Sequence, residues 1–378
     1  MRRLLQEAMA DGAFGFSTGL LYAPGIFTPP EEIVDLAAVL PRDAIYTSHI
    51  RGSSETLLSA TKELIRVGEA NGLAYQHSHL EAFGRDNWRK MESLLRLHEE
   101  SRERGVDGGF DVIPYVYANT TLLAILPPWS LEGGISALLE RLRDPSTRRR
   151  IGRAIEEDVP GWPCWNAGGW PHNLVEATGW ANISLMWVES ENNKHLEGRA
   201  IADIAEERGT TPFDVAADLI LDEQGHAMAL FIGVSGDRDD EQWLEQAMAH
   251  PFAAFETDAI VTGKGVPHPA AYGAFPRVLG HFCRDRHLFT LEDAVRRITS
   301  LPAQRFGLKK RGGIRAGNWA DITIFDPHTI ADRSTDTASP RSPAGIDLVM
   351  VNGHVVVRGG KQVAGRHAGR VLRRGGND

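Results

Sequence analysis

The first 120 residues alternate between short apolar runs and longer segments with helical spacing. The strand-like runs are 12–20, 44–50, 73–80 and 108–115, and the helix-like segments between them are 30–41, 53–72 and 86–104. Strands separated by helices at this rhythm are typical of βα units, which build parallel sheets. The pattern therefore predicts an α/β fold, and it leaves open whether the sheet is doubly wound or closed into a barrel.

The rhythm breaks between about residues 120 and 250. Five of the nine tryptophans lie there in a stretch rich in glycine and proline, at positions 162, 165, 170, 180 and 187. One interpretation is a long surface loop that its aromatic side chains hold in place. The other is a lid over a substrate, because long loops in compact domains are often functional. The earlier rhythm returns with a strand-like run at 250–260 and a helix-like segment at 290–307.

The last 70 residues consist of short β-rich runs joined by glycine turns. The sequence VNGHVV at 351–356 is a type I′ hairpin signal, because asparagine and glycine tolerate the positive φ angles of that turn. We therefore expect two parts: an α/β body at 1–308, with an insertion at about 120–250, and a small β module at 309–378.

Charge and composition exclude several classes of protein. The chain carries 41 basic and 50 acidic residues and a formal net charge of -9, which disfavours nucleic acid or an anionic membrane as the main partner. Only two cysteines occur, Cys164 and Cys283, so the sequence indicates a reducing compartment rather than a disulfide scaffold. It has no run of about twenty apolar residues. A soluble cytoplasmic protein is expected.

Three polar residues stand at the ends of strand-like runs: His49, His79 and Asp258. In parallel α/β folds functional residues collect at the carboxyl ends of the strands, because those ends open onto one face. Two imidazoles and a carboxylate are a partial ligand set for Zn²⁺. Each residue also has a structural alternative, as a hydrogen-bonded histidine or as an aspartate that caps the next helix.

His77 precedes His79 by two residues and so shares a face of the same strand. It could bind the same ion. Alternatively, and in our preferred interpretation, it packs one layer deeper and bonds to a backbone carbonyl.

Six sequence blocks make the chain recognisable by their combination and order. They are GAFGFSTGLLYAPG, TSHIRGSSE, HSHLEA, FETDAIVTGKGVPHPAAYGAFPRVLG, LPAQRFGLKKRGGIRAGNWADITIFDP and VMVNGHVVVRGG. The chain resembles, from its first residues to its last, the D-aminoacylases, which are N-acyl-D-amino-acid deacylases of the amidohydrolase superfamily. The resemblance implies a (β/α)8 TIM-like barrel with a small β-sandwich, of which the C-terminal module is a part. It also implies a zinc-dependent amide hydrolysis.

The resemblance assigns roles to single residues. His49 and His79 match the family's two zinc-binding histidines on successive strands, and Asp258 matches its catalytic aspartate. Tyr22 and Arg51 lie in blocks that line the substrate side. In the implied mechanism zinc polarises the amide carbonyl and activates water, while Asp258 takes the water's proton and delivers it to the leaving amine.

The substrate side has one ambiguous residue and two departures. Arg51 can bind a carboxylate through two parallel hydrogen bonds, and its alternative is a surface ion pair with Glu55. Glu81 stands where the family commonly has lysine, and Ala270 where it usually has arginine. Both changes remove positive charge, so a substrate other than one with a free α-carboxylate is also considered.

The family's first strand carries a His-x-His motif, and a cysteine ligand lies upstream as well. In this chain no histidine precedes His49 and no cysteine precedes Cys164, so the barrel is expected to be incomplete at its N-terminus. Three interpretations follow: a fragment of an ordinary deacylase, one half of a split enzyme completed by an N-terminal segment, or a catalytically inactive remnant that acts as a binding module.

The predicted function is zinc-dependent hydrolysis of a linear amide C–N bond in a small N-acylated amino acid, most simply an N-acyl-D-amino acid. The alternative reaction is that of a cyclic-amide hydrolase of the dihydroorotase or hydantoinase type. A second copy of the chain or a complementing N-terminal segment is the protein partner considered.

Overall fold

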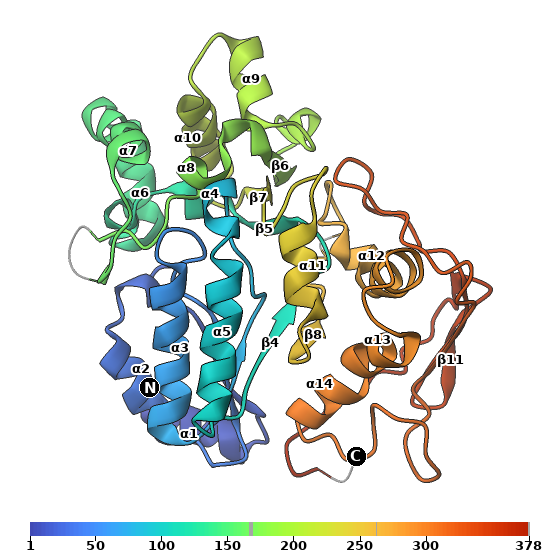
Figure 1. Cartoon of the computed structure of the whole chain (residues 1–378). Coiled ribbons are helices and arrows are strands. Elements are labelled where there is room, and N and C mark those ends of the chain that lie inside the picture. The colour runs from blue at the N-terminus through green and yellow to red at the C-terminus, as the bar shows by residue number, and fades with distance from the viewer. Residues whose placement is uncertain (166–168, 262, 377–378) are drawn as a thin grey trace.

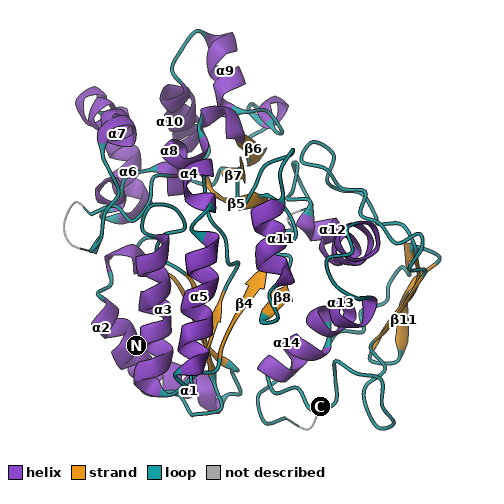
Figure 2. Ribbon diagram, viewed as in Figure 1, coloured by secondary structure: helices purple, strands orange, loops and turns teal. Residues whose placement is uncertain are grey.

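A parallel sheet of five strands lies at the centre of the body. The structure is a computed structural model that describes residues 1–165, 169–261 and 263–376. The strand order is β1-β2-β3-β4-β8, and Figures 1 and 2 show helices packed beside the sheet. The strands are β1 (Gly15–Gly19), β2 (Ile45–His49), β3 (Ala74–His77), β4 (Gly108–Val112) and β8 (Ala253–Phe255). The α/β, TIM-like fold expected from the sequence is confirmed, with five parallel strands in the described part of the chain.

Helices cover this sheet and bury its core. The α-helices of the body are α1 (Arg2–Ala10), α2 (Pro30–Ala37), α3 (Leu57–Asn71), α4 (Arg85–Trp88), α5 (Met91–Glu103), α11 (Gln242–Ala249), α12 (Ala270–Arg277), α13 (Leu291–Ile298) and α14 (Ser300–Arg305). Two further segments are the 3-10 turn η1 (Gly25–Phe27) and the π-helix η6 (Val278–Asp285). Helix α3 packs on β2 and β3, α5 packs on β4, and α11 and α13 pack on β8. The core includes Tyr46, Tyr75 and Phe110, which have no exposed surface.

The segment between β4 and α11 builds a second layer with its own apolar core. Its antiparallel sheet has the order β5-β7-β6. The strands are β5 (Tyr117–Thr121), β6 (Ile183–Trp187) and β7 (Met228–Ile232). The helices are α6 (Gly134–Arg143), α7 (Pro145–Glu157), α8 (Leu174–Thr178), α9 (Ile201–Arg208) and α10 (Pro212–Asp222), with 3-10 turns η2 (Leu122–Ile125), η3 (Pro128–Leu131), η4 (Trp180–Asn182) and η5 (Lys194–Leu196). Leu138, Ile204 and Phe231 are among the side chains buried in this separate core.

This second layer sits over the carboxyl ends of the parallel strands. The backbone N–H of Gly84, in the segment after β3, donates to the carbonyl of Gly233 at 2.9 Å. Phe83 forms an isolated bridge with Val234. In Figure 1 the layer is the green part of the molecule, and the arrow of β4 points towards it. The loops that follow the parallel strands are therefore enclosed between the two layers.

The C-terminal module is an antiparallel sheet of order β12-β11-β10-β9. Its strands are β9 (Ile322–Phe325), β10 (Ile346–Val351), β11 (His354–Arg358) and β12 (Lys361–Gln362). The β10–β11 turn places Asn352 at φ 48° and Gly353 at φ 81°. Two consecutive positive φ angles are the mark of a type I′ turn, so the predicted hairpin is confirmed.

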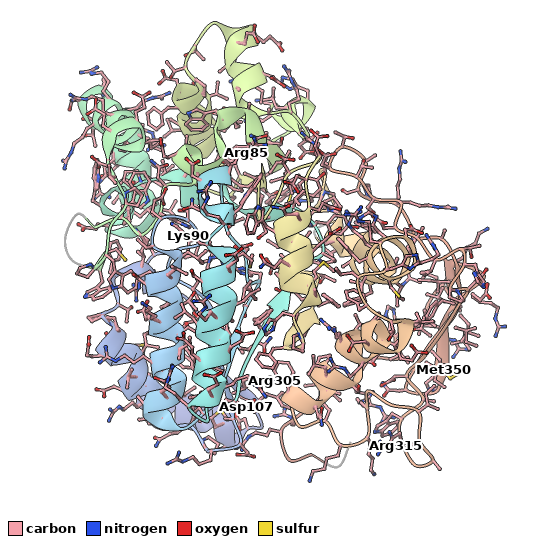
Figure 3. The ribbon with its side chains drawn as sticks, viewed as in Figure 1. Arg85, Lys90, Asp107, Arg305, Arg315 and Met350 are labelled. Atoms are coloured by element: carbon pink, nitrogen blue, oxygen red, sulfur yellow. The ribbon has the colours of Figure 1, made fainter. Side chains whose placement is uncertain are left out.

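Several helix boundaries differ from the expectation. The helix expected over 53–72 begins at Leu57. The helix expected over 86–104 is divided into α4 and α5. Lys90, which is labelled in Figure 3, lies between them. Its amine donates to the carbonyls of Ser54 and Glu55 at 3.0 and 3.1 Å, so this break ties the helix pair to the loop after β2.

The opposite end of the sheet is tied to α14. Figure 3 shows Arg305 beside Asp107 at the amino end of β4. The guanidinium Nη1 lies 2.5 Å from the Asp107 carboxylate, and Nη2 donates to the carbonyl of Tyr75 at 2.6 Å.

No helix in the described part of the chain is long and apolar enough to cross a membrane.

Candidate functional site

One small cavity gathers four of the five predicted site residues. Tyr22, His49, His79 and Asp258 all line it. Its volume is about 20 Å³, which is room for about one water molecule or ion. The cavity lies where β2, β3 and β8 end, as the strand-end argument predicts. Arg51 is not one of the described residues that line it.

The two histidine rings contact each other in this cavity. His49 is the last residue of β2, and His79 lies two residues beyond the end of β3. His49 Nδ1 is 2.7 Å from His79 Nε2, and the ring centroids are 4.4 Å apart. His79 has a φ of 43°, which is strained for a residue other than glycine. Its backbone N–H donates to Asp111 Oδ1 at 2.7 Å, and this bond stabilises the strained turn.

The two imidazoles differ in charge. Burial lowers the pKa of His49 well below its ordinary value, and neighbouring imidazoles lower it further. Burial also acts to lower the pKa of His79, but Glu81, with smaller contributions from Glu256 and Asp258, outweighs it and raises the pKa to about 10. A charged His79 therefore donates its Nε2–H to the Nδ1 of a neutral His49.

Glu81 is a site residue whose role was not evident from the sequence. Its Oε1 lies 3.1 Å from His79 Nδ1, and only 6% of the residue surface is exposed. A carboxylate behind an imidazole fixes the ring's orientation and raises its basicity. The departure from lysine noted in the sequence therefore places a negative charge on the far side of His79. In the sequence, the only local signal for the contact between Glu81 and His79 was their separation by two positions.

Asp258 reaches the cavity from the segment after β8. It lies three residues beyond Phe255, the last residue of that strand, and its backbone has a φ of 40°. Its carboxylate acts to raise the pKa of both Tyr22 and His79, which reflects their proximity. Nearby, burial and the neighbouring Asp111 carboxyl raise the pKa of Glu256 well above its ordinary value.

Tyr22 forms the wall of the cavity beside His49. Its ring centroid is 5.1 Å from that of His49, and its hydroxyl is 2.8 Å from the Thr120 hydroxyl. Burial raises the pKa of Tyr22 to about 12, with a smaller opposing effect from Thr120. The phenol is therefore protonated at neutral pH and can donate a hydrogen bond.

Arg51 is placed differently from the other four residues. Its side chain is fully buried, and two of its nitrogens contact the Glu63 carboxylate at 3.0 and 2.7 Å. The other N–H groups donate to the carbonyls of Gly25, Ile26 and Thr28. All five donors are therefore engaged. The partner is Glu63 rather than Glu55, so the surface ion pair considered from the sequence is wrong. The predicted substrate contact stays a prediction, and it would require Arg51 to exchange partners.

His77 packs one layer below the cavity. It has no exposed surface, and its Nδ1 is 3.1 Å from His98 Nε2. His98 Nδ1 in turn lies 3.0 Å from the Tyr75 hydroxyl. The deeper position that we preferred is confirmed, but the partner is a histidine side chain rather than a backbone carbonyl.

His172 is a further residue of the cavity that the sequence did not single out. It comes from the tryptophan-rich segment, is 1% exposed and lines the cavity. The backbone N–H of Ser53 donates to its Nδ1 at 3.4 Å. Because Nδ1 accepts, the proton of the neutral ring lies on Nε2, which is buried without a hydrogen-bond partner in the described structure. Asn119 also lines the cavity, and both polar atoms of its side chain are likewise buried without a described hydrogen-bond partner.

The donor chemistry of the histidine pair suits a metal ion, but the pair is not a complete site. Imidazole is a preferred zinc ligand, and His49 Nε2 is buried without a described hydrogen-bond partner. Among the residues that the structure describes, no group of three or more histidine, cysteine, aspartate or glutamate side chains could hold a metal. His49 and His79 therefore fit as two ligands of a metal, with further ligands still to be supplied.

Comparisons with known proteins identify what the chain is similar to. Residues 182–357 match the model of the amidohydrolase family. The chain is 32% identical to a D-aminoacylase and 31% identical to an N-acyl-D-glutamate deacylase, both of Alcaligenes xylosoxydans xylosoxydans. Each alignment covers 99% of this chain and 64% of the relative, so the chain spans less than two thirds of their length.

A solved structure supports the same relationship. The chain matches N-acyl-D-glutamate deacylase from Bordetella bronchiseptica with a TM-score of 0.77 and 30% identity, over 98% of this chain and 65% of the other. That protein is complexed with zinc and a phosphonate inhibitor that mimics the tetrahedral intermediate of the reaction. The resemblance expected from the six sequence blocks is confirmed.

Proposed function

We propose that this chain, which has the amidohydrolase fold and resembles the D-aminoacylases along its length, takes part in the metal-dependent hydrolysis of N-acyl-D-amino acids. The observation that carries the proposal is the meeting of His49, His79, Asp258 and Tyr22 at one cavity. The relatives' printed activities supply the substrate class.

The histidine pair would hold the metal, with zinc as the leading candidate because the Bordetella relative contains it. A metal bound there would polarise the amide carbonyl and lower the pKa of a bound water to about 7. Glu81 would orient the His79 ring through the contact at Nδ1. His79 would have to lose a proton on metal binding, because only the unprotonated nitrogen is a ligand.

Asp258 would act as general base and then as general acid. Its carboxylate would accept a proton from the attacking water as the C–O bond forms. It would return that proton to the nitrogen as the C–N bond breaks, giving a free amine and a carboxylic acid, which then loses its own proton to water at neutral pH. The protonated Tyr22 hydroxyl would donate a hydrogen bond to the bound substrate. The role of Arg51 would be to hold the loop that contains Tyr22, through the carbonyls of Gly25, Ile26 and Thr28.

The test is an assay of the purified 378-residue chain, freed of metal and then reconstituted with zinc. N-acetyl-D-amino acids are supplied, and release of the free amine is followed, with the N-acetyl-L-amino acids as the stereochemical control. We expect zinc-dependent release from the D-substrates. Asp258→Asn should retain zinc and lose turnover. If the zinc-loaded chain released no amine from any D-substrate, the hydrolytic function would be rejected for this chain.

A further inference from the structure

The amide side chain of Asn119 is a buried polar group that the proposed mechanism does not use. Asn119 lies in β5, is 6% exposed and lines the cavity of the histidine pair. Its Oδ1 and its Nδ2 are both buried without a hydrogen-bond partner in the described structure. Such groups are rare in folded proteins, because burying them unpaired is costly. The amide therefore points to a ligand that supplies the partners.

The backbone of Asn119 is held by the sheet of the second layer. Asn119 pairs with Leu230 of β7. The hydroxyl of the next residue, Thr120, is 2.8 Å from the Tyr22 hydroxyl at the cavity wall. Because this backbone is paired within a sheet, no flexible loop can carry the amide out to solvent. The unpaired amide is thus a fixed feature of the cavity wall.

The two polar atoms of the amide restrict the chemistry of the ligand. Oδ1 accepts a hydrogen bond and Nδ2 donates one, so the ligand must offer both a donor and an acceptor. A primary carboxamide presents its carbonyl oxygen and one N–H side by side, and it can satisfy both atoms at once. A carboxylate or an ester offers acceptors alone and would leave Oδ1 unpaired. The scissile amide is trans, with its C=O and N–H on opposite sides, so it cannot form this pair either.

The charges of the cavity wall favour a neutral ligand group as well. Glu81 and Asp258 both line the cavity. Burial raises the pKa of the Tyr22 phenol, and the Asp258 and Glu81 carboxylates raise it further, so their negative field reaches that wall. Neither lysine nor arginine is found among the described residues that line the cavity. A carboxylate would be repelled by the two like charges, whereas a carboxamide would not.

We propose that Asn119 is a specificity-determining residue that recognises a primary carboxamide, and that the preferred substrates are N-acyl-D-amino acid amides rather than the free acids. Oδ1 accepts from an N–H of the ligand's carboxamide, and Nδ2 donates to its carbonyl oxygen. The inference rests on the proposed function, because it places the acylated nitrogen of the same molecule at the histidine pair. It narrows the substrate class to compounds with a neutral C-terminal amide.

The first experiment measures binding rather than turnover, by isothermal titration of the metal-free chain. Three ligands differ at one end only: N-acetyl-D-alaninamide, N-acetyl-D-alanine methyl ester and N-acetyl-D-alanine. The ester is neutral but lacks the donor, and the acid adds the charge. In this state the protonated His79 balances only one of the Glu81 and Asp258 carboxylates. We expect the carboxamide to bind at least about tenfold more tightly than the ester, and the free acid to bind most weakly.

Asn119→Leu then tests whether the preference comes from this residue. Leucine has the same branched shape without polar atoms, so the carboxamide should lose at least about tenfold in affinity and bind no more tightly than the ester. Stability in urea should not fall, because the substitution leaves no partner unpaired, whereas a purely structural role of Asn119 would lower it. Asn119→Ala removes the same two atoms if leucine is not accommodated. The matched control is Asn192→Leu, at an exposed position of the second layer outside the cavity, which should change neither quantity.

The outcomes separate the recognition of the carboxamide from the hydrolysis. Equal or tighter binding of the free acid, or carboxamide binding that the Asn119 variants leave unchanged, would overturn the inference even if the zinc-loaded chain hydrolysed N-acetyl-D-amino acids. A preference that depends on Asn119, in a chain that releases no amine from any substrate, would support the inference and overturn the proposed hydrolysis. The last ligand is 5-methylhydantoin, a ring amide that also presents C=O and N–H on one side. Tighter binding of this ring than of the carboxamide would overturn the open-chain class.

Discussion

The buried pair of Arg51 and Glu63 predicts a large loss of stability when one partner is neutralised. The two side chains are 0% and 3% exposed, and their closest atoms are 2.7 Å apart. Removing one partner of a buried ion pair typically costs about 3–5 kcal/mol, because the remaining charge is left in a medium that solvates it poorly. In Glu63→Gln the guanidinium keeps its backbone carbonyl partners. We therefore expect a loss at the lower end, about 3 kcal/mol.

The assay is equilibrium unfolding in urea, followed by tryptophan fluorescence and by circular dichroism. Linear extrapolation gives the free energy of unfolding for the parent chain and for the variant. The matched control is Glu31→Gln, which neutralises the exposed pair of Arg66 and Glu31, with its atoms 3.2 Å apart and its side chains 57% and 67% exposed. Exposed pairs contribute at most about 1 kcal/mol.

A cost for Glu63→Gln no larger than that for Glu31→Gln would contradict a stabilising role of the buried pair. It would mean that Arg51 is readily solvated and so free to leave Glu63 for a substrate carboxylate. A cost of about 3 kcal/mol would instead support the view that Arg51 holds the η1 loop, and with it Tyr22, in place.

Three further predictions concern single residues of the site and its surroundings. Asp258→Asn should lower kcat by a factor of about 10²–10⁴ while zinc content by metal analysis stays unchanged, and loss of zinc in this variant would make Asp258 a ligand instead. Glu81→Gln should lower the pKa of His79, which Glu81 raises, and an unaltered His79 titration by NMR would contradict the contact at Nδ1. Burial lowers the pKa of His98 to about 3, below its ordinary value of 6.5, so the unfolded chain binds this proton first and stability falls as pH drops from 6.5 towards 3. Between pH 7 and pH 5 this residue should lower the free energy of unfolding by about 2 kcal/mol. The variant His98→Gln should lack this pH-dependent loss. If the difference in stability between the two proteins did not change with pH, the prediction would be wrong.

Local sequence signals located the strand ends correctly. His49, His79 and Asp258 could be predicted as neighbours because parallel strands bring their carboxyl ends to one face. The turn at Asn352 and Gly353 was predictable because its positive φ angles depend on the two residues themselves.

Contacts between distant segments could not be predicted in the same way. His172 meets Ser53 across 119 positions of the chain, and nothing in the tryptophan-rich segment marks that residue as part of a site. Arg51 pairs with Glu63, twelve positions away on α3, although Glu55 has the spacing that an i,i+4 rule would favour. Burial rather than spacing decides this pairing, because the loop after β2 turns the guanidinium into the core.

The division of the helix expected over 86–104 had no local signal either. Neither glycine nor proline lies between α4 and α5. The amine of Lys90 instead bonds acceptors in the loop after β2, which is a tertiary interaction that overrides the helical preference of the segment.

A zinc titration of the metal-free 378-residue chain measures whether His49 and His79 bind a metal together. A competing chromophoric chelator reports the affinity, and His49→Ala and His79→Ala are compared with His195→Ala, which removes an exposed histidine outside the cavity. We expect one zinc per chain, bound at least about tenfold more weakly in each of the first two variants and with unchanged affinity in the third. Equal zinc affinity in all four proteins, or no zinc binding by the unmodified chain, would contradict this expectation.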